Sequence, residues 1–371
     1  MKILFYSPVK LITGGGCGRW HSDITNSLKN LFGFEIEIII GNLGYNHWSK
    51  QYLRQQLQSV EYVQLNFIIF FGLLIPTPSI FFFLLKKFKD ADVVHFIHGF
   101  LGQDILILIL KLLTRKKVVV GHHAPIFHSS KIHNFYMKYI SRFILKFFDY
   151  HQALNKHDKA FLEKEWGLKN VFFIPSGVRV EKFLKIEPIK HNNLVFISVG
   201  RYALQKGYDL LLLAIGKFNH IFPNNRAEFW FVGDGELKRL IQSYCEKYKN
   251  IKDLGYVKYE AMPGIYAKSD VYLLPSREEP FGLVLIESWA CGLPTLATKT
   301  EGPKDMLKES KNGWFIHKIS SEEICNSLST LYNMYLSDEN CFNKIEKNCR
   351  ETAAMFSIDT TAKRMTKAFF S

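Results

Sequence analysis

The sequence predicts an α/β protein with two domains, each built on a parallel sheet. The chain has 371 residues, which is more than a single hydrophobic core usually serves. Short runs rich in Val, Ile and Phe alternate with helical stretches, as expected of parallel strands joined by helices. The alternation occurs twice, on either side of residues 184–193 (LKIEPIKHNN). That segment is polar, contains Pro188 and lacks periodicity, so we predict it to be the linker.

Each half of the chain contains four clear strand signals. In the first half these are Lys2–Tyr6, Glu35–Ile40, Val93–Ile97 and Lys117–Val120. In the second half they are Leu194–Val199, Glu228–Val232, Ile251–Leu254 and Val271–Pro275. We therefore expect an N-terminal domain at residues 1–188, a second domain at 189–352 and a C-terminal segment at 353–371.

Residues 277–292 (REEPFGLVLIESWACG) form a candidate anion site. A Pro-Phe-Gly turn opens an apolar helix, so the amide groups of Gly282, Leu283 and Val284 lack acceptors within the helix and face the positive end of its dipole. A phosphate suits that position. Glu279 and Glu287 are eight residues apart, which is about 12 Å along a helix, or roughly the span of a ribose, a diphosphate and a hexose. The alternative is that both glutamates are ordinary helix residues, Glu287 facing solvent and Glu279 near the dipole.

A second loop supplies positive charge. Arg201 and Lys206 follow the strand Leu194–Val199 and precede a helix that begins near Tyr208. Two cations at the carboxyl end of a parallel strand are placed where open α/β sheets bind ligands, and they suit a diphosphate. The alternative is surface ion pairing, which is common for loop Lys and Arg.

Taken together in order and spacing, the motifs resemble those of one enzyme family along nearly the whole chain. Besides the two loops they include Gly14-Gly15-Gly16, DVVHFIH, VVVGHH, IPSGVRVEKF, GDGE, DLGYV and DVYLLPS. The chain is similar to the retaining glycosyltransferases of family 4, of the group 1 type. This resemblance implies the GT-B fold, with two facing Rossmann-like domains, a cleft between them and a C-terminal helix crossing back to the first domain. Residues 358–370 are the candidate for that helix.

The resemblance also implies roles for individual residues. Arg201 and Lys206 would hold the donor diphosphate, Glu279 would contact the donor sugar and Glu287 the ribose. The backbone of Gly15 and Gly16 would approach the phosphates and the acceptor, and Phe281, Gly282, Leu283 and Val284 would form the donor turn. His123 would touch the transferred sugar. Because His122 precedes it directly, the two histidines could exchange roles.

The reaction expected from the resemblance is transfer of a hexose from a UDP- or GDP-linked donor to a hydroxyl group, with retention of the α configuration. The acceptor would be a saccharide or a polyprenyl- or lipid-linked molecule, in surface polysaccharide, lipopolysaccharide or glycolipid synthesis. Positioning and electrostatic stabilisation, rather than a dedicated base, would carry catalysis. The alternatives are a nucleotide-sugar 2-epimerase with the same fold and a non-catalytic, membrane-associated scaffold.

We expect no metal and no cofactor, because Arg201 and Lys206 would replace the cation. Asp90-Ala91-Asp92 reads as a D-x-D motif, but it precedes a strand, and we interpret it as structural. The six cysteines show no C-x-x-C spacing or pairing pattern, and no cleavable signal peptide is recognised. Reduced thiols and a cytoplasmic location are therefore expected.

Positive charge is concentrated in the first half of the chain. Residues 1–190 hold 25 Lys and Arg against 13 Asp and Glu, whereas residues 191–371 hold 23 against 21. Within the first half, the apolar run 67–85 leads into Lys86-Lys87, and residues 135–148 (FYMKYISRFILKFF) mix cations with aromatics. This favours peripheral contact with an anionic membrane surface, on the cytoplasmic face. The alternative is burial of these segments in the core. Nucleic-acid binding is not expected, because no zinc or base-stacking motif accompanies the charge.

Overall fold

The chain forms two compact units in the computed structural model, which describes residues 1–9, 16–43, 60–70, 73–123, 126, 130–189 and 192–370. One unit comprises residues 1–177 and 358–371, and the other comprises residues 178–357. These divisions differ from the boundaries expected at 188 and 352.

Arg350 explains much of the difference. Its guanidinium donates hydrogen bonds to the carbonyl oxygens of Leu184 and Ile186, both at 2.8 Å. It also reaches the carbonyl oxygen of Ala290, at 3.1 Å. The start of the expected linker is thereby attached to the second unit, together with the helix that carries Arg350.

The first unit contains a sheet of seven parallel strands in the order β3-β2-β1-β6-β7-β8-β9. The four strands predicted for this half are present, and three of them extend further than expected. The strands are β1 (Lys2–Val9), β2 (Glu35–Leu43), β3 (Glu61–Gln64), β6 (Val93–Ile97), β7 (Lys117–His122), β8 (Tyr150–Ala153) and β9 (Val171–Phe173).

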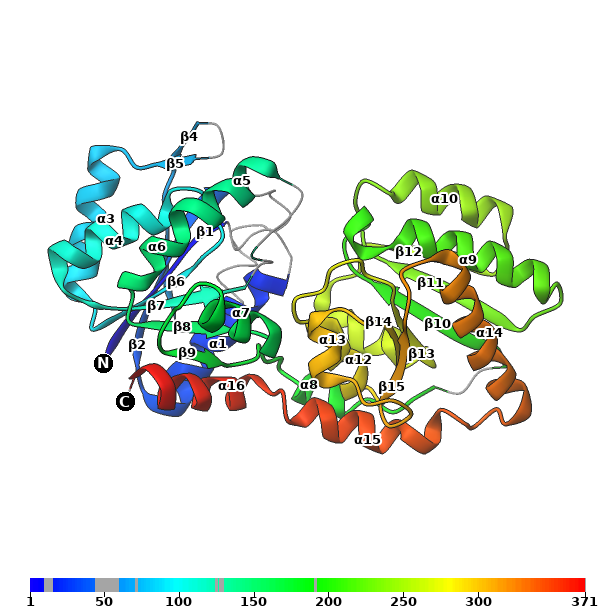
Figure 1. Ribbon diagram of the computed structural model, residues 1–371. Helices are drawn as coiled ribbons and strands as arrows, with labels where there is room; N and C mark the ends of the chain where they lie inside the picture. Colours follow the sequence, from blue (N-terminus) through cyan, green and yellow to red (C-terminus); the bar gives the residue numbers. More distant parts are fainter. Residues whose placement is uncertain are drawn as a thin grey trace. The chain divides into compact units, whose positions relative to one another are not determined.

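Helices cover both faces of this sheet (Figure 1). One face carries α1 (Gly16–Phe32), α16 (Ile358–Met365) and η6 (Thr366–Phe370). Hydrogen bonds from Ser27 to Asp359 and from Thr361 to the carbonyl of Pro175 attach α16 to this unit. The other face carries α3 (Pro78–Asp90), α4 (Gln103–Thr114), α5 (Lys131–Tyr136), η2 (Met137–Ser141), α6 (Arg142–Ile144), η3 (Leu145–Phe147) and α7 (Lys156–Lys164).

The apolar run 67–85 forms two different structures. A small antiparallel hairpin, β4 (Ile68–Phe70) and β5 (Leu73–Ile75), precedes α3. The side chain of Thr77 caps α3, and Pro78 occupies its first turn, where a missing amide proton costs nothing. Among the described residues, no helix has the length and apolar character needed to cross a bilayer.

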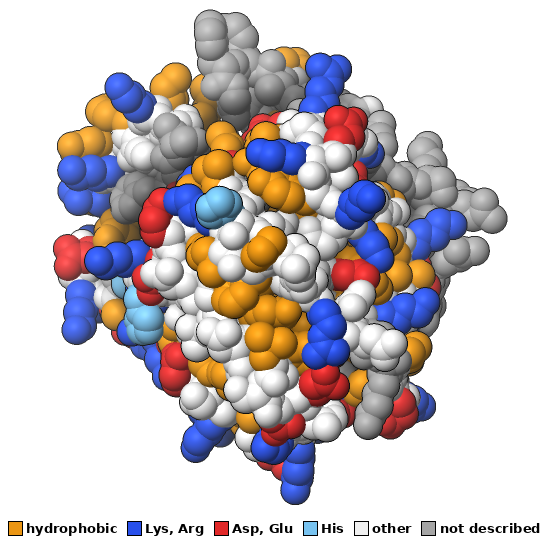
Figure 2. Space-filling view, turned by 90° about the vertical axis from the view of Figure 1, so that its right-hand side faces the viewer, with side chains coloured by type: hydrophobic (Ala, Val, Ile, Leu, Met, Phe, Trp, Pro, Cys, Tyr) orange, Lys and Arg blue, Asp and Glu red, His pale blue; other side chains and the backbone are white. Residues whose placement is uncertain are grey.

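The second unit contains a sheet of six parallel strands in the order β12-β11-β10-β13-β14-β15. The strands are β10 (Leu194–Val199), β11 (Ala227–Val232), β12 (Ile251–Gly255), β13 (Val271–Leu274), β14 (Thr295–Thr298) and β15 (Gly313–Ile316). The helices are α8 (Glu181–Leu184), η4 (Leu204–Lys206), α9 (Tyr208–Ile221), α10 (Lys238–Lys247), η5 (Tyr259–Ala261), α11 (Met262–Tyr266), α12 (Leu283–Ala290), α13 (Glu301–Met306), α14 (Ser321–Ser337) and α15 (Asn343–Ala354). On the face of the molecule shown in Figure 2, cationic and anionic side chains are interspersed.

Strand order determines where a ligand site can form in the second unit. From β10 the chain adds β11 and β12 on one side, and then returns to add β13, β14 and β15 on the other. The loops that follow β10 and β13 therefore leave the same edge of the sheet as direct neighbours, in opposite directions. Open α/β sheets bind ligands at such a switch point.

Candidate functional site

The two loops at the switch point touch through a glycine. Gly207 ends η4 with φ at 72°, a left-handed conformation that suits a residue without a Cβ. A Cβ at this position would lie 2.0 Å from the carbonyl oxygen of Pro275, in the loop after β13. The close approach brings η4, which carries Lys206, beside the loop that carries Glu279.

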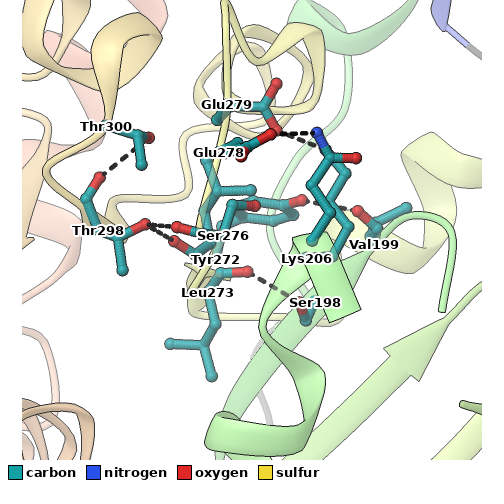
Figure 3. A network of polar contacts seen from close by, with 12 residues as sticks. Ser198, Val199, Lys206, Tyr272, Leu273, Ser276, Glu278, Glu279, Thr298 and Thr300 are labelled. Carbon is teal, nitrogen blue, oxygen red and sulfur yellow. Dashed lines mark hydrogen bonds and ion pairs between the residues drawn. The ribbon is translucent and has the colours of Figure 1, made fainter. Parts of the chain in front are cut away.

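Lys206 and Glu279 form an ion pair across the two loops (Figure 3). Nζ of Lys206 lies 2.5 Å from Oε2 of Glu279. The carboxylate is nearly buried, with 9% of its side chain exposed, whereas 24% of the lysine side chain is exposed. Sequence analysis predicted both residues for the site but not that they bind each other. Arg201 lies in the same loop with an exposed side chain.

Arg277 stabilises the turn that carries Lys206 through hydrogen bonds. Its two terminal nitrogens each donate to one carboxylate oxygen of Asp209, both at 2.7 Å, and one of them also donates to the carbonyl of Leu204, at 2.5 Å. The backbone amide of Arg277 donates to the carbonyl of Gln205, at 2.8 Å. The hydrogen bond from Arg277 lowers the pKa of Asp209, so that the pair stays charged. The pair could not be predicted from the sequence, because nothing local in either segment indicates the other.

Hydroxyl groups join the strands beneath the two loops (Figure 3). The hydroxyl of Tyr272 donates to the carbonyl of Val199, at 3.0 Å, and the hydroxyl of Ser198 donates to the carbonyl of Leu273, at 2.9 Å. Burial raises the pKa of Tyr272 well above its usual value, so the hydroxyl keeps its proton. Thr298 on β14 donates to the carbonyl of Ser276, at 2.5 Å. These bonds fix β10, β13 and β14 at the edge where the site lies.

The Pro-Phe-Gly turn opens α12 through a glycine in the left-handed conformation. Gly282 is the N-cap of α12 with φ at 94°, and Phe281 is buried. The amide of Gly302 donates to the carbonyl of Glu279, at 2.9 Å, and a Cβ on Gly302 would lie 2.2 Å from the carbonyl oxygen of Phe281. The backbone of Gly302 and the packing of the Phe281 ring against Phe356 thus hold the turn in place. Leu283 and Val284 then offer the first amides of an eight-residue helix.

Glu287 is buried, which excludes the interpretation that it is a solvent-facing helix residue. Only 2% of the residue is exposed, and its Oε2 accepts a hydrogen bond of 3.4 Å from the hydroxyl of Tyr266. A buried carboxylate is costly unless it is paired or hydrogen-bonded. Glu279 and Glu287 therefore both lie inside the protein beside the turn, rather than on its surface.

The residues predicted in the first unit are only partly described. Gly15 lies outside the described residues, and Gly16 is the first residue of α1. His123 follows β7, with its ring centroid 4.2 Å from that of Trp20 on α1. Burial and the nearby His95 and His21 hold the pKa of His123 well below its usual value, so the imidazole is neutral. Its Nε2 is buried and has no hydrogen-bond partner among the described residues.

His122 and His123 occupy opposite faces of the sheet. Nε2 of His122 lies 3.3 Å from Nδ1 of His151, and its ring packs against His98. These groups belong to the face covered by α4 and α6, whereas His123 belongs to the face covered by α1. Burial, followed by the nearby His98 and His151, lowers the pKa of His122 well below its usual value. Consecutive residues of an extended chain point to opposite faces of a sheet. His122 could therefore take the role expected of His123 only if the sugar bound on the other face.

The second unit matches a known enzyme family. A model of "Glycosyl transferases group 1" matches residues 179–352. The UDP-Gal:alpha-D-GlcNAc-diphosphoundecaprenol alpha-1,3-galactosyltransferase of Escherichia coli is 30% identical over 292 residues, covering 72% of this chain and 71% of its own. The chain belongs to the group 1 glycosyl transferases. An uncharacterized 41.2 kDa protein in the cps region of Klebsiella pneumoniae is 24% identical to this glycosyl transferase over 294 residues, covering 74% of this chain and 78% of its own.

Solved structures confirm the fold of the glycosyl transferase. Anabaena HepE, solved in complex with UDP and glucose, has a TM-score of 0.77 at 18% identity and covers all of both chains. TarM of S. aureus, solved with fondaparinux, alpha-GlcNAc-glycerol and UDP, has a TM-score of 0.75 at 13% identity over the same full coverage. Together with the two parallel sheets, these likenesses establish the GT-B fold that the sequence predicted.

The D-x-D motif of the glycosyl transferase lies at the amino-terminal edge of its sheet. Asp90 ends α3, and Asp92 accepts a hydrogen bond of 2.8 Å from the amide of Lys2, where β1 begins. Ligands of parallel sheets bind at the opposite, carboxyl-terminal edge. In the described part of the chain, no three His, Cys, Asp or Glu side chains come together as metal ligands would.

Proposed function

We propose that the protein transfers a hexose from a UDP-linked donor to a hydroxyl of a saccharide or lipid-linked acceptor, with retention of the α configuration. The observation that carries the proposal is the Lys206–Glu279 pair beside the open N-terminus of α12. A nearly buried carboxylate bound to a lysine, next to the first amides of α12, which have no acceptor within the helix, suits a donor that has a sugar at one end and a diphosphate beside it.

In the proposed donor complex, Lys206, Arg201 and the amides of Leu283 and Val284 bind the diphosphate. Glu279 accepts hydrogen bonds from the hexose hydroxyls, and Glu287 accepts them from the ribose. His123, with a neutral imidazole, faces the transferred sugar. His122 ends β7 and His123 follows it. We assign this role to His123 because its Nε2 has no partner among the described residues, whereas that of His122 is bound to His151.

In the proposed reaction, the bond between the anomeric carbon and the β-phosphate oxygen breaks, and a bond from the acceptor oxygen to that carbon forms on the same face. The hydroxyl proton of the acceptor passes to the departing phosphate oxygen. Positive charge on Arg201 and Lys206 stabilises the leaving diphosphate, in the place where other enzymes use a divalent cation. Removing one such donor typically lowers turnover by roughly 100- to 1,000-fold.

UDP is proposed over GDP because the Escherichia coli relative is named for UDP-Gal and because HepE and TarM were solved with UDP. The same relative is named for a diphosphoundecaprenol acceptor, which supports a lipid-linked acceptor here. A lipopolysaccharide core glycosyltransferase of Rhizobium meliloti, 30% identical over 129 residues, supports surface polysaccharide or lipopolysaccharide synthesis as the setting. The five cysteines whose side chains are described are free thiols, which agrees with the proposed cytoplasmic location.

Calorimetric titration with UDP, GDP and ADP tests the donor site. We expect selective binding of UDP, lost in Arg201→Ala and Lys206→Ala but retained in Lys247→Ala, a matched exposed cation on α10. Selective binding of GDP would overturn the UDP assignment, and binding of none of the three would favour the non-catalytic scaffold. Release of a free isomerised sugar from the UDP-hexose would favour the 2-epimerase. The anomeric coupling constant of the product then tests retention.

A further inference from the structure

Three helical segments of the first unit present apolar side chains to solvent. They are α3, α4 and the continuous helical run 131–147, which comprises α5, η2, α6 and η3. They cover one face of the sheet, with α3 beside α4 and α4 beside α6 (Figure 1). We call their outer side the α3–α6 surface. Its large exposed apolar residues are Phe82, Ile105, Ile109, Leu112, Leu113, Ile132, Phe135, Tyr139, Ile140, Phe143 and Phe147.

Helix α4 is apolar on both sides. Its inner side buries Leu106, Ile107 and Leu110. Its outer side carries Ile109 and Leu112, which are 43% and 65% exposed. A helix that faces water usually carries polar residues at such positions. A helix that is apolar all round is stable only when its second face is also removed from water. The outer stripe of α4 therefore indicates a contact that the described residues of this chain do not supply.

The run 131–147 has the same character and adds aromatic rings and cations. Phe135, Phe143 and Phe147 are 61%, 48% and 62% exposed. The guanidinium carbon of Arg142 lies 4.5 Å and Nζ of Lys146 lies 5.7 Å from the ring centroid of Phe143. Long basic side chains that lie along exposed aromatics keep their charge near the polar boundary while the rings enter an apolar phase.

Acidic residues are nearly absent from the α3–α6 surface. The run 131–147 contains none, and α4 contains only Asp104, which is fully buried and bound by the hydroxyl of Tyr136. In α3 the single acidic residue is Asp90, at the C-terminal end. This composition contrasts with the face in Figure 2, where Asp and Glu side chains lie among the Lys and Arg side chains. A protein partner would have to present a large acidic and apolar face, whereas an anionic bilayer combines negative headgroups with an apolar interior.

We infer that the α3–α6 surface docks the enzyme on an anionic lipid bilayer, with its rings and aliphatic side chains at the headgroup boundary. The inference rests on the proposed function in one respect, namely that the acceptor is lipid-linked and reached at the membrane. Neither the apolar side chains nor the basic residues alone would hold the protein on the bilayer. The apolar contact is weak by itself and needs the attraction of the basic residues to the lipid headgroups as a second contribution. Each lysine near an anionic surface strengthens binding by about fivefold.

Vesicle sedimentation tests the inference with the full-length protein. The probes are vesicles of phosphatidylcholine alone and of phosphatidylcholine with phosphatidylglycerol. We expect binding to the anionic vesicles only, weakening as salt is raised. The double variant Lys138→Gln/Lys146→Gln should bind roughly 30-fold more weakly. The matched control is Lys247→Gln, because Lys247 lies 5.2 Å from the ring of Tyr248 in the second unit, as Lys138 lies 5.3 Å from the ring of Tyr139.

Phe143→Ser/Phe147→Ser separates the apolar contribution from the charge, and Leu213→Ser, at an exposed position of α9, is its control. All variants should bind UDP as the wild type does, which shows that the second unit is intact, and should unfold at the wild-type temperature, which shows that the first unit is folded. The inference would be overturned if the protein did not bind vesicles at low salt. It would also be overturned if the wild type, the double lysine variant and the double phenylalanine variant bound equally well. A dimer in solution that the phenylalanine variant dissociates would overturn it too, in favour of an interface between copies. If the wild type did not bind UDP, the proposed donor site would be contradicted, and the docking inference would not.

Discussion

The side chains of Lys206 and Glu279 meet at 2.5 Å although 73 residues separate them in the chain. The pair joins the loop after β10 to the loop after β13 at the switch point of the second sheet. In the absence of a donor, Glu279 satisfies the charge of Lys206. A bound diphosphate and Glu279 would therefore compete for the same ammonium group.

The competition predicts an unusual effect of Glu279→Gln. Removing the carboxylate charge while keeping the side-chain shape should tighten UDP binding by about 1 kcal/mol, or about fivefold, because a negative charge near the diphosphate is lost. Hexose transfer should slow by at least about tenfold, because a contact to the donor sugar is weakened. Titration with UDP and initial rates measure the two effects. Glu278→Gln, at the exposed neighbouring carboxylate, is the control and should change neither. Weaker UDP binding by Glu279→Gln would show that Glu279 orients Lys206 and does not compete for it.

Arg277 is predicted to position Lys206 without contacting the donor. Arg277→Lys cannot keep both hydrogen bonds to Asp209 together with the one to Leu204, so the turn 204–206 should loosen. We expect the KM for the donor to rise about tenfold, with a smaller change in kcat.

A double-mutant cycle checks the role of Arg277. Asp209→Asn should raise the donor KM in the same way, and the double variant should add little to either. Arg226→Lys, at the exposed pair with Glu339, is the control and should leave the donor KM unchanged. Fully additive losses would mean that the two residues act separately.

Transfer is predicted to proceed at the same rate in EDTA. In the proposed donor complex, Arg201 and Lys206 would supply the positive charge that a metal would otherwise place on the diphosphate, and the D-x-D motif lies at the amino-terminal edge of the first sheet. Initial rates with and without the chelator measure this. A complete loss of activity that Mg²⁺ restores would refute the prediction. The activity of Asp90→Asn in the presence of Mg²⁺ would then show whether the D-x-D motif is involved.

Acid should destabilise the first unit. Burial lowers the pKa of His98 to about 4 and those of His95 and His151 to about 3. Above about pH 6.5 these groups are neutral in both the folded and the unfolded chain and contribute no pH dependence. Below that pH the unfolded chain binds protons that the folded chain does not, so the free energy of unfolding falls by about 1.4 kcal/mol per pH unit for each histidine until the folded pKa is reached.

Urea unfolding at several pH values between about 7 and 5 measures the slope. His98→Gln should make the slope shallower by the contribution of one group. An unfolding free energy that stays constant over this range would show that the histidines already carry their protons in the folded chain.

Local patterns were enough to predict much of the fold. The strands β1, β2, β6, β7, β10, β11 and β13 were indicated by apolar runs, because strands buried on both faces read as continuous Val, Ile and Phe segments, and β12 (IKDLG), which is only partly buried, was predicted as well. Two strands of the second unit without a continuous Val, Ile and Phe run were missed. β14 (TLAT) contains two threonines and β15 (GWFI) begins with glycine, so neither stands out from a loop, whereas β13 (VYLL), of the same length, is apolar throughout.

The candidate site divides in the same way. The sequence by itself determined that Arg201 and Lys206 follow one strand, that Glu279 precedes a helix-opening turn and that the first half of the chain is basic, because these properties depend on residues close together in the chain. The tertiary structure alone decided that Lys206 pairs with Glu279, that Arg277 holds Asp209, that Glu287 is buried and that His122 and His123 face apart. Those relationships depend on strand order and side-chain packing between distant segments, which the spacing of residues along the chain does not encode.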